Sequence, residues 1–102
     1  MNHFAVIFTA SVANTTDPLY ATTSKRLREL AQEQPGYLGI ECLETADREI
    51  TISYWKSLEA IAAWRNNHEH KTAIYMGKTL WYKDYDVKVV EIHRHYHSEN
   101  LA

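Results

Sequence analysis

The sequence predicts an α+β domain with a four-stranded antiparallel sheet in the ferredoxin-like order β-α-β-β-α-β. Three observations lead to this fold class. A strand pattern at residues 50–55 opens directly into a helical pattern from Ser57 to His68, and further strand patterns surround a first helix. The length of 102 residues leaves room for one core. We therefore expect a single domain over residues 1–97 and a C-terminal tail over residues 98–102.

The first half of the chain carries one helix and three strands. The first strand is apolar on both faces, which is typical of a strand that is covered on both sides. The helix starts at Asp17, an N-cap residue followed by proline, and Pro35-Gly36 ends it. The strands are expected at residues 3–12, 37–44 and 49–55, and a turn at 46–48 joins the last two as a hairpin.

The second half carries a long helical region and the last strand. Ser57 caps the helix, which extends to His68. After the polar pair Asn66-Asn67 the helical pattern resumes at Ala73, Met76 and Leu80, with an interruption at Gly77. The last strand is expected from Tyr85 to His95. The inner face of the helix that Ser57 caps consists of Leu58, Ile61, Trp64 and His68. These residues follow one another at spacings of three, three and four.

Composition and charge exclude several classes of protein. The net charge is -2 and the 11 Lys and Arg residues are spread along the chain, which argues against nucleic acid or an anionic membrane as a partner. The first residues lack the pattern of a secretory signal, and no stretch is long enough to span a bilayer. A single cysteine, Cys42, excludes an internal disulfide. We expect a soluble cytoplasmic protein.

The same patterns predict a homodimer. Helices cover only one face of a ferredoxin-like sheet, and the chain has no further element for the other face. The first and last strands are nevertheless apolar on both faces, so a second copy of the sheet is the expected cover.

One stretch resembles a known family, the antibiotic biosynthesis monooxygenase domain. The similarity lies in the run of residues 53–61, followed by Trp64, Glu69-His70, Ala73, Gly77, Trp81-Tyr82 and Tyr85. The resemblance implies a dimeric α/β barrel. It also implies one of several activities, because some members of the family use O₂ without flavin or metal and others degrade haem.

The marks of individual branches of the family are mostly missing. Trp64 matches the tryptophan of the haem-degrading branch, but Ile74 stands where its iron-ligating histidine is expected. The first-strand asparagine of that branch falls near Ile7 or Phe8, and the asparagine of the quinone-forming branch falls at Ala60. We therefore expect no specific haem binding and no other cofactor.

The candidate site lies between the second helix and the sheet, where a small apolar or aromatic ligand is expected. His68 is the candidate base, since histidine is a common general base and His68 shares a helix face with Trp64, and its alternative role is that of a boundary residue at a helix end. Trp64, Tyr75, Tyr82 and Tyr85 are candidate substrate-binding residues. The alternatives are a core anchor for the tryptophan and a dimer interface for the tyrosines.

The remaining histidines suggest no structural metal site. His93, His95 and His97 alternate, as metal ligands on a strand do, but they lie where the chain runs out into a polar tail. His68 and His70 are two residues apart, which points them to different sides of a helix, and only a break there would let both reach one ion.

Two function hypotheses follow. One is a cofactor-independent monooxygenase acting on a phenol or quinol, and the other is a non-catalytic dimeric ligand-binding or stress-response domain. A haem binder that uses His68 or His70 is a third possibility.

Overall fold

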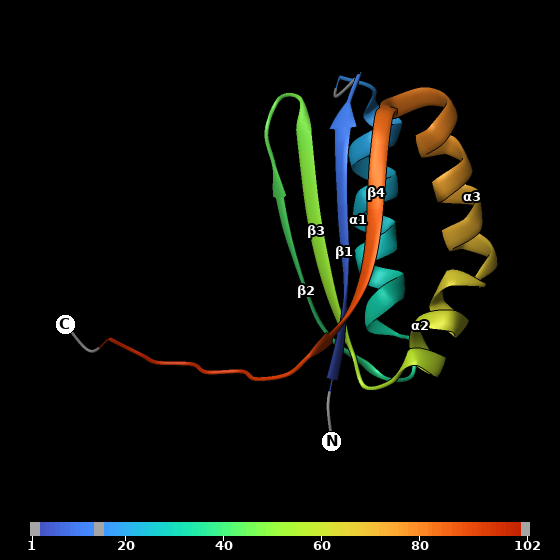
Figure 1. The fold of residues 1–102 in the computed structure, drawn as a ribbon. Coiled ribbons are helices and arrows are strands. Elements are labelled where there is room, and N and C mark those ends of the chain that lie inside the picture. The colour runs from blue at the N-terminus through green and yellow to red at the C-terminus, as the bar shows by residue number, and fades with distance from the viewer. Residues whose placement is uncertain (1–2, 14–15, 101–102) are drawn as a thin grey trace.

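The computed structural model describes residues 3–13 and 16–100. It contains one four-stranded antiparallel sheet, and its helices pack on one face of that sheet (Figure 1). The predicted ferredoxin-like fold class is confirmed. The elements are β1 (His3–Val12), α1 (Pro18–Gln32), β2 (Tyr37–Glu44), β3 (Arg48–Trp55), α2 (Leu58–Arg65), α3 (His68–Met76), the π-helical turn η1 (Gly77–Trp81) and β4 (Tyr82–Ile92).

The strand order β2-β3-β1-β4 places β1 in the centre of the sheet. Phe4 pairs with Trp55 and Phe8 with Thr51, so these side chains share one face. Because successive strand residues point to opposite faces, Glu49, Thr51, Ser53 and Trp55 of β3 all face the helices.

Helix α1 begins as its sequence predicts. The Asp17 side chain accepts a hydrogen bond from the backbone N–H of Leu19 at 3.0 Å, and Pro18 occupies the first turn. Trp81 Nε1 donates a second hydrogen bond to Asp17 at 2.9 Å, which ties the start of α1 to the π turn. Beyond the helix, Gly36 has φ +84°, a conformation that L side chains rarely adopt.

The predicted second helix, which extended from Ser57 to His68, is shorter in the structure. Helix α2 ends at Arg65, and Asn67 caps a new helix by accepting a hydrogen bond from the backbone N–H of His70 at 3.2 Å. Asparagine favours caps over helix interiors because its side chain competes for backbone hydrogen bonds. Trp64 and His68 therefore lie on different helices, and the predicted shared inner face does not exist.

The last strand is also displaced from its predicted position. Strand β4 runs from Tyr82 to Ile92 rather than from Tyr85 to His95. The π turn ends at Trp81, so the chain enters the sheet earlier than the pattern indicated. Residues 93–100 follow the strand without regular structure and extend away from the domain (Figure 1).

Two groups of buried residues form the core between the helices and the sheet. The first lies under α1 and α2, and its buried members are Leu30, Ala31, Trp55, Ile61 and Trp64. The second lies near the π turn and consists of Val12, Tyr20 and Trp81.

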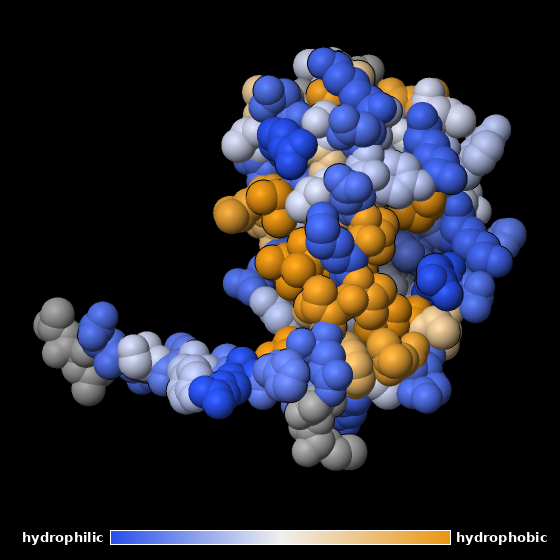
Figure 2. Space-filling model, in the orientation of Figure 1, coloured by the Kyte–Doolittle hydropathy of each residue, from blue (hydrophilic) through white to orange (hydrophobic). Residues whose placement is uncertain are grey.

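The face of the sheet opposite the helices is apolar and uncovered. Figure 2 shows hydrophobic side chains gathered over the strands on this side. Leu43 is 75% exposed, and Ile50 and Val90 are exposed as well. The homodimer that this face predicts stays a prediction. Within residues 3–13 and 16–100, no helix is long and apolar enough to cross a membrane.

Candidate functional site

A cavity of about 440 Å³ lies between the helical layer and the inner face of the sheet. Much of its wall is apolar, and Val6, Phe8, Val87 and Val89 of β1 and β4 contribute from the sheet. The side chains in its wall that can titrate or form hydrogen bonds are Ser24, Arg28, Cys42, Glu49, Thr51, Ser53, Trp64, Arg65, His70, Tyr82 and Tyr85.

His70 and Trp64 form a stacked pair in the wall of this cavity. Their ring centroids are 4.3 Å apart and the rings are inclined by 13°. Trp64 in turn stacks on Trp55, whose Nε1 donates to Ser53 Oγ at 2.9 Å. The break between α2 and α3 makes the pair possible, since it turns the first residues of α3 back over Trp64.

The surroundings of His70 define its protonation state. Burial lowers the pKa of its imidazole, so the ring is neutral at pH 7. Nδ1 lies 3.1 Å from the Trp64 carbonyl oxygen, which can only accept a hydrogen bond, so Nδ1 carries the proton. Nε2 then carries no proton, and it has no hydrogen-bond partner among the described residues. Every buried side-chain nitrogen of these residues has a partner, so Nε2 is not buried. Nε2 is thus accessible and able to accept a proton.

A second polar group in the wall is centred on Glu49. Its carboxylate accepts hydrogen bonds from Tyr20 at 2.5 Å, Tyr82 at 3.2 Å and Thr51 at 3.1 Å. Burial, followed by the hydrogen bond to Glu49, raises the pKa of Tyr20, so its phenol stays protonated and donates. The pKa of Tyr82 rises through burial and the charge of Glu49.

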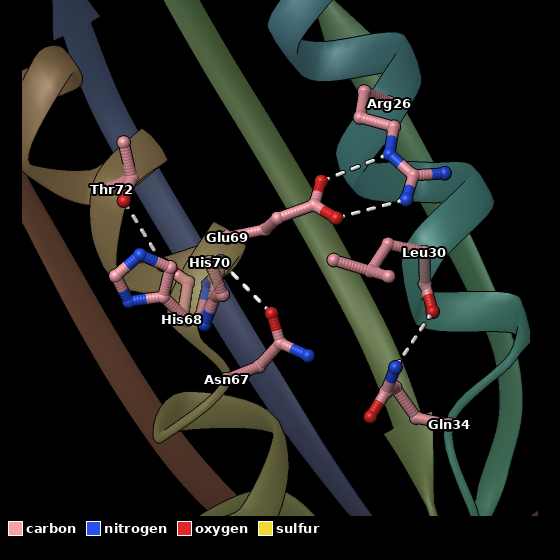
Figure 3. Close-up of polar contacts among 8 residues, drawn as sticks. All are labelled: Arg26, Leu30, Gln34, Asn67, His68, Glu69, His70 and Thr72. Carbon is pink, nitrogen blue, oxygen red and sulfur yellow. Dashed lines mark hydrogen bonds and ion pairs between the residues drawn. The ribbon is translucent and has the colours of Figure 1, made fainter.

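The structure places the predicted site residues in two groups. Trp64, Tyr82 and Tyr85 line the cavity. Tyr75 is 68% exposed and is not in the cavity wall. His68 is also exposed and borders a smaller hollow between α1 and α3. Figure 3 shows this region, where Arg26 and Glu69 join the two helices by an ion pair of 2.9 Å. His68 and Tyr75 thus have no access to the large cavity.

His70 and Glu49 are the two cavity residues that the sequence analysis did not select. The pair Asn66-Asn67 was the available signal for His70, because a cap at Asn67 restarts the helix and changes which histidine faces inward. The signal for Glu49 was the two-residue period of β3, which puts it on the face of Trp55.

Cys42 and the tail histidines show no sign of reactivity or metal binding. Burial raises the pKa of the Cys42 thiol, and its sulfur lies 3.4 Å from the Thr51 hydroxyl. Strand β4 ends before His93, so the tail histidines do not alternate on a strand as expected. Over residues 3–13 and 16–100, no group of three or more His, Cys, Asp or Glu side chains could hold a metal ion.

The family follows from a comparison of the sequence with protein families. The model of the antibiotic biosynthesis monooxygenase domain matches residues 3–75. The chain belongs to this family. It is 44% identical over 93 residues to YqjZ of Bacillus subtilis, an uncharacterised protein, and the match covers 90% of this chain and 81% of YqjZ.

Solved structures of family members share the fold. A candidate antibiotic biosynthesis monooxygenase from Deinococcus radiodurans aligns with a TM-score of 0.82 at 14% identity, over 95% of this chain and 99% of that one. A variant of SnoaB, a cofactor-independent oxygenase from Streptomyces nogalater, aligns with a TM-score of 0.78 at 10% identity, over 93% and 97%. At such identities the likeness shows the fold alone.

Proposed function

We propose that this protein is a cofactor-independent monooxygenase that acts on a small phenol or quinol held in the cavity between the helices and the sheet. The observation that carries the proposal is the neutral His70, stacked on Trp64 in the wall of an apolar cavity. His70 takes the role of base that we had assigned to His68, because only His70 lines the cavity.

The chemistry needs a base and a dry pocket more than it needs a cofactor. For an anthrone, Nε2 of His70 accepts the acidic C–H proton and leaves an electron-rich anion. The anion passes one electron to O₂, and the two radicals combine into a carbon-bound peroxide that takes the proton back from the imidazolium. Loss of water then leaves a carbonyl, so one oxygen atom enters the product and the other leaves as water. The apolar walls keep bulk water from the anion.

Oxygen uptake tests the proposal directly. The wild-type protein should consume O₂ with members of a panel of hydroquinones and anthrones, and the His70→Gln variant should not. Release of one H₂O and incorporation of one ¹⁸O atom from ¹⁸O₂ would identify the monooxygenase stoichiometry. A panel that binds without oxygen uptake would instead support the alternative, a dimeric ligand-binding domain.

A haem site is the second candidate, and one observation favours it. His70 lines the cavity together with Arg28 and Arg65, and its Nε2 is not buried. We still expect no stoichiometric haem complex, because Ile74 occupies the position of the family's ligand. Hemin titration checks this, and a sharp Soret band that His70→Gln abolishes would establish the haem alternative.

The uncovered sheet face supports a homodimer as the working form. Leu43, Ile50 and Val90 expose apolar surface on the side away from the helices. We expect sedimentation equilibrium to give the mass of two chains at micromolar concentration, and Leu43→Glu to shift the equilibrium toward monomer. A folded wild-type monomer under these conditions would contradict the dimer and leave the cavity proposal untouched.

A further inference from the structure

We propose that Glu49 is the anchor for a second hydroxyl group of the ligand, at the end of the cavity remote from His70, so that the protein selects aromatic diols over simple phenols. This inference rests on the proposed function only in placing an aromatic ligand in the cavity. It concerns binding and not turnover.

Glu49 is a buried carboxylate. The residue is 6% exposed and lies in the cavity wall. A buried carboxylate is normally paired with a cation. Among the described residues, no Lys, Arg or His side chain forms an ion pair with Glu49, and the ion pairs there are Arg26 with Glu69 and His97 with Glu99. The charge of Glu49 is therefore stabilised by neutral groups.

Hydroxyl groups surround the Glu49 carboxylate. All its side-chain partners are hydroxyls, two from Tyr20 and Tyr82 on Oε1 and one from Thr51 on Oε2. An ionised carboxylate has about four acceptor positions. Oε1 already accepts two bonds and Oε2 one, so Oε2 retains capacity for one more donor.

The remaining acceptor position on Oε2 of Glu49 selects the kind of ligand group that can bind. A carboxylate without a proton accepts hydrogen bonds and cannot donate them, so a ligand group must bring its own hydrogen. A hydroxyl matches the three hydroxyls already present. An ether or a carbonyl at the same place would face the carboxylate with lone pairs and be repelled.

The position of Glu49 sets it apart from the stacked rings. Glu49 and Trp55 lie on the same face of β3 and are six residues apart, or about 20 Å along the strand. The stack of Trp64 and His70 starts at Trp55, whereas Glu49 belongs with Tyr20 and the π turn. A ligand hydroxyl bound by Glu49 therefore lies on the part of the ligand that points away from the stacked rings.

Three naphthalene ligands test the proposal without turnover. The probes are 2,6-dihydroxynaphthalene, its monomethyl ether 6-methoxy-2-naphthol, and 2-naphthol, which has no second group. Binding is measured under anaerobic conditions by quenching of tryptophan fluorescence. A hydrogen bond to a charged acceptor is worth about 10-fold or more in affinity, so the diol should bind at least about 10-fold more tightly than the ether.

Variants of Glu49 then assign the preference to this residue. Glu49→Gln replaces the charged acceptor with a neutral amide, which binds a hydroxyl less strongly, so the diol should lose most of its advantage over the ether. Glu49→Asp keeps an acceptor but withdraws it by one methylene, so part of the preference should remain. If Glu49→Gln fails to fold, the partial loss in Glu49→Asp carries the test.

Two results would overturn the inference. One is equal affinity of wild type for the diol and the ether, and the other is an undiminished preference in both variants. Oxygen uptake is a separate measurement. A diol preference that depends on Glu49, in a protein that consumes no O₂, would sustain this inference and refute the monooxygenase.

Discussion

The two ends of the cavity are built from different interactions. At one end, Trp55, Trp64 and His70 are rings in stacked contact, and the titratable group among them is kept neutral by burial. At the other end, Glu49 is held by directional hydrogen bonds from hydroxyls. The end with the stacked rings, called the ring end below, suits proton transfer because a neutral base is available there. The Glu49 end suits recognition, because its acceptor is fixed in place.

The largest effect should come from the base at the ring end. His70→Gln removes the proton acceptor but keeps a side chain of similar polarity, so any oxygen uptake should fall by about 100-fold or more. The matched control is His68→Gln, two residues away and outside the cavity, which should stay within about two-fold of wild type. Equal losses in both variants, measured with an oxygen electrode, would remove the distinction between the two histidines.

The next largest effect concerns the packing of the ring end. Trp64→Ala should lower the free energy of unfolding by about 3 kcal/mol, the lower part of the usual range for a buried tryptophan, since Trp64 also lines the cavity. Trp64→Phe should lower it by only about 1 kcal/mol. Urea denaturation measures both. A loss below about 1 kcal/mol for the alanine variant would mean that the stack does not hold α2 to the sheet.

A smaller effect is expected where the Glu49 end loses one donor. Tyr20→Phe leaves the buried carboxylate with one hydrogen bond fewer, which should lower the free energy of unfolding by about 1 to 3 kcal/mol. Tyr54→Phe is the control, because Tyr54 makes a hydrogen bond of 2.6 Å to Glu41 at the surface. The Tyr54→Phe variant should lose about 0.5 kcal/mol of unfolding free energy. Similar losses in the two variants would show that burial adds nothing to the Glu49 interactions.

The last expected effect is a pH dependence that belongs to the ring end alone. The pKa of His70 is lower in the folded protein than in the unfolded chain, so the unfolded chain binds its proton first as the pH falls. Stability is complete above the ordinary histidine pKa and is lost as the pH falls through the folded value. Oxygen uptake should fall over the same range. Thermal unfolding of His70→Gln should lack this component, and an unchanged pH profile would contradict the assignment.

Much of the fold could be predicted because its signals are local. Asp17-Pro18 marks the start of α1, and Pro35-Gly36 marks the turn into β2, since each acts within a few residues through fixed backbone geometry. The register of β1 against β3 was not predictable in the same way. It depends on Phe4 and Trp55, which meet only in the folded sheet.

The site was predicted less well than the fold, and the reason lies in one helix junction. A continuous helix through Asn66-Asn67 would put His68 on the face of Trp64, whereas a cap at Asn67 puts His70 there. Asparagine favours the cap, but its propensity is too weak to decide the junction by itself. His70 stacks on Trp64 across the break between α2 and α3. The periodicity of a single helix does not predict a contact between two helices.

The sequence by itself determined the class of fold, the family and the apolar character of both sheet faces, because these follow from element order and from the types of residue at each position. Tertiary structure decided which histidine is buried, which tyrosines line the cavity and how Glu49 keeps its charge without a cation. The physical reason is that burial and hydrogen bonding depend on residues far apart in the chain, such as Tyr20, Glu49 and Tyr82, which only the paired strands and the packed helices bring within a few ångströms.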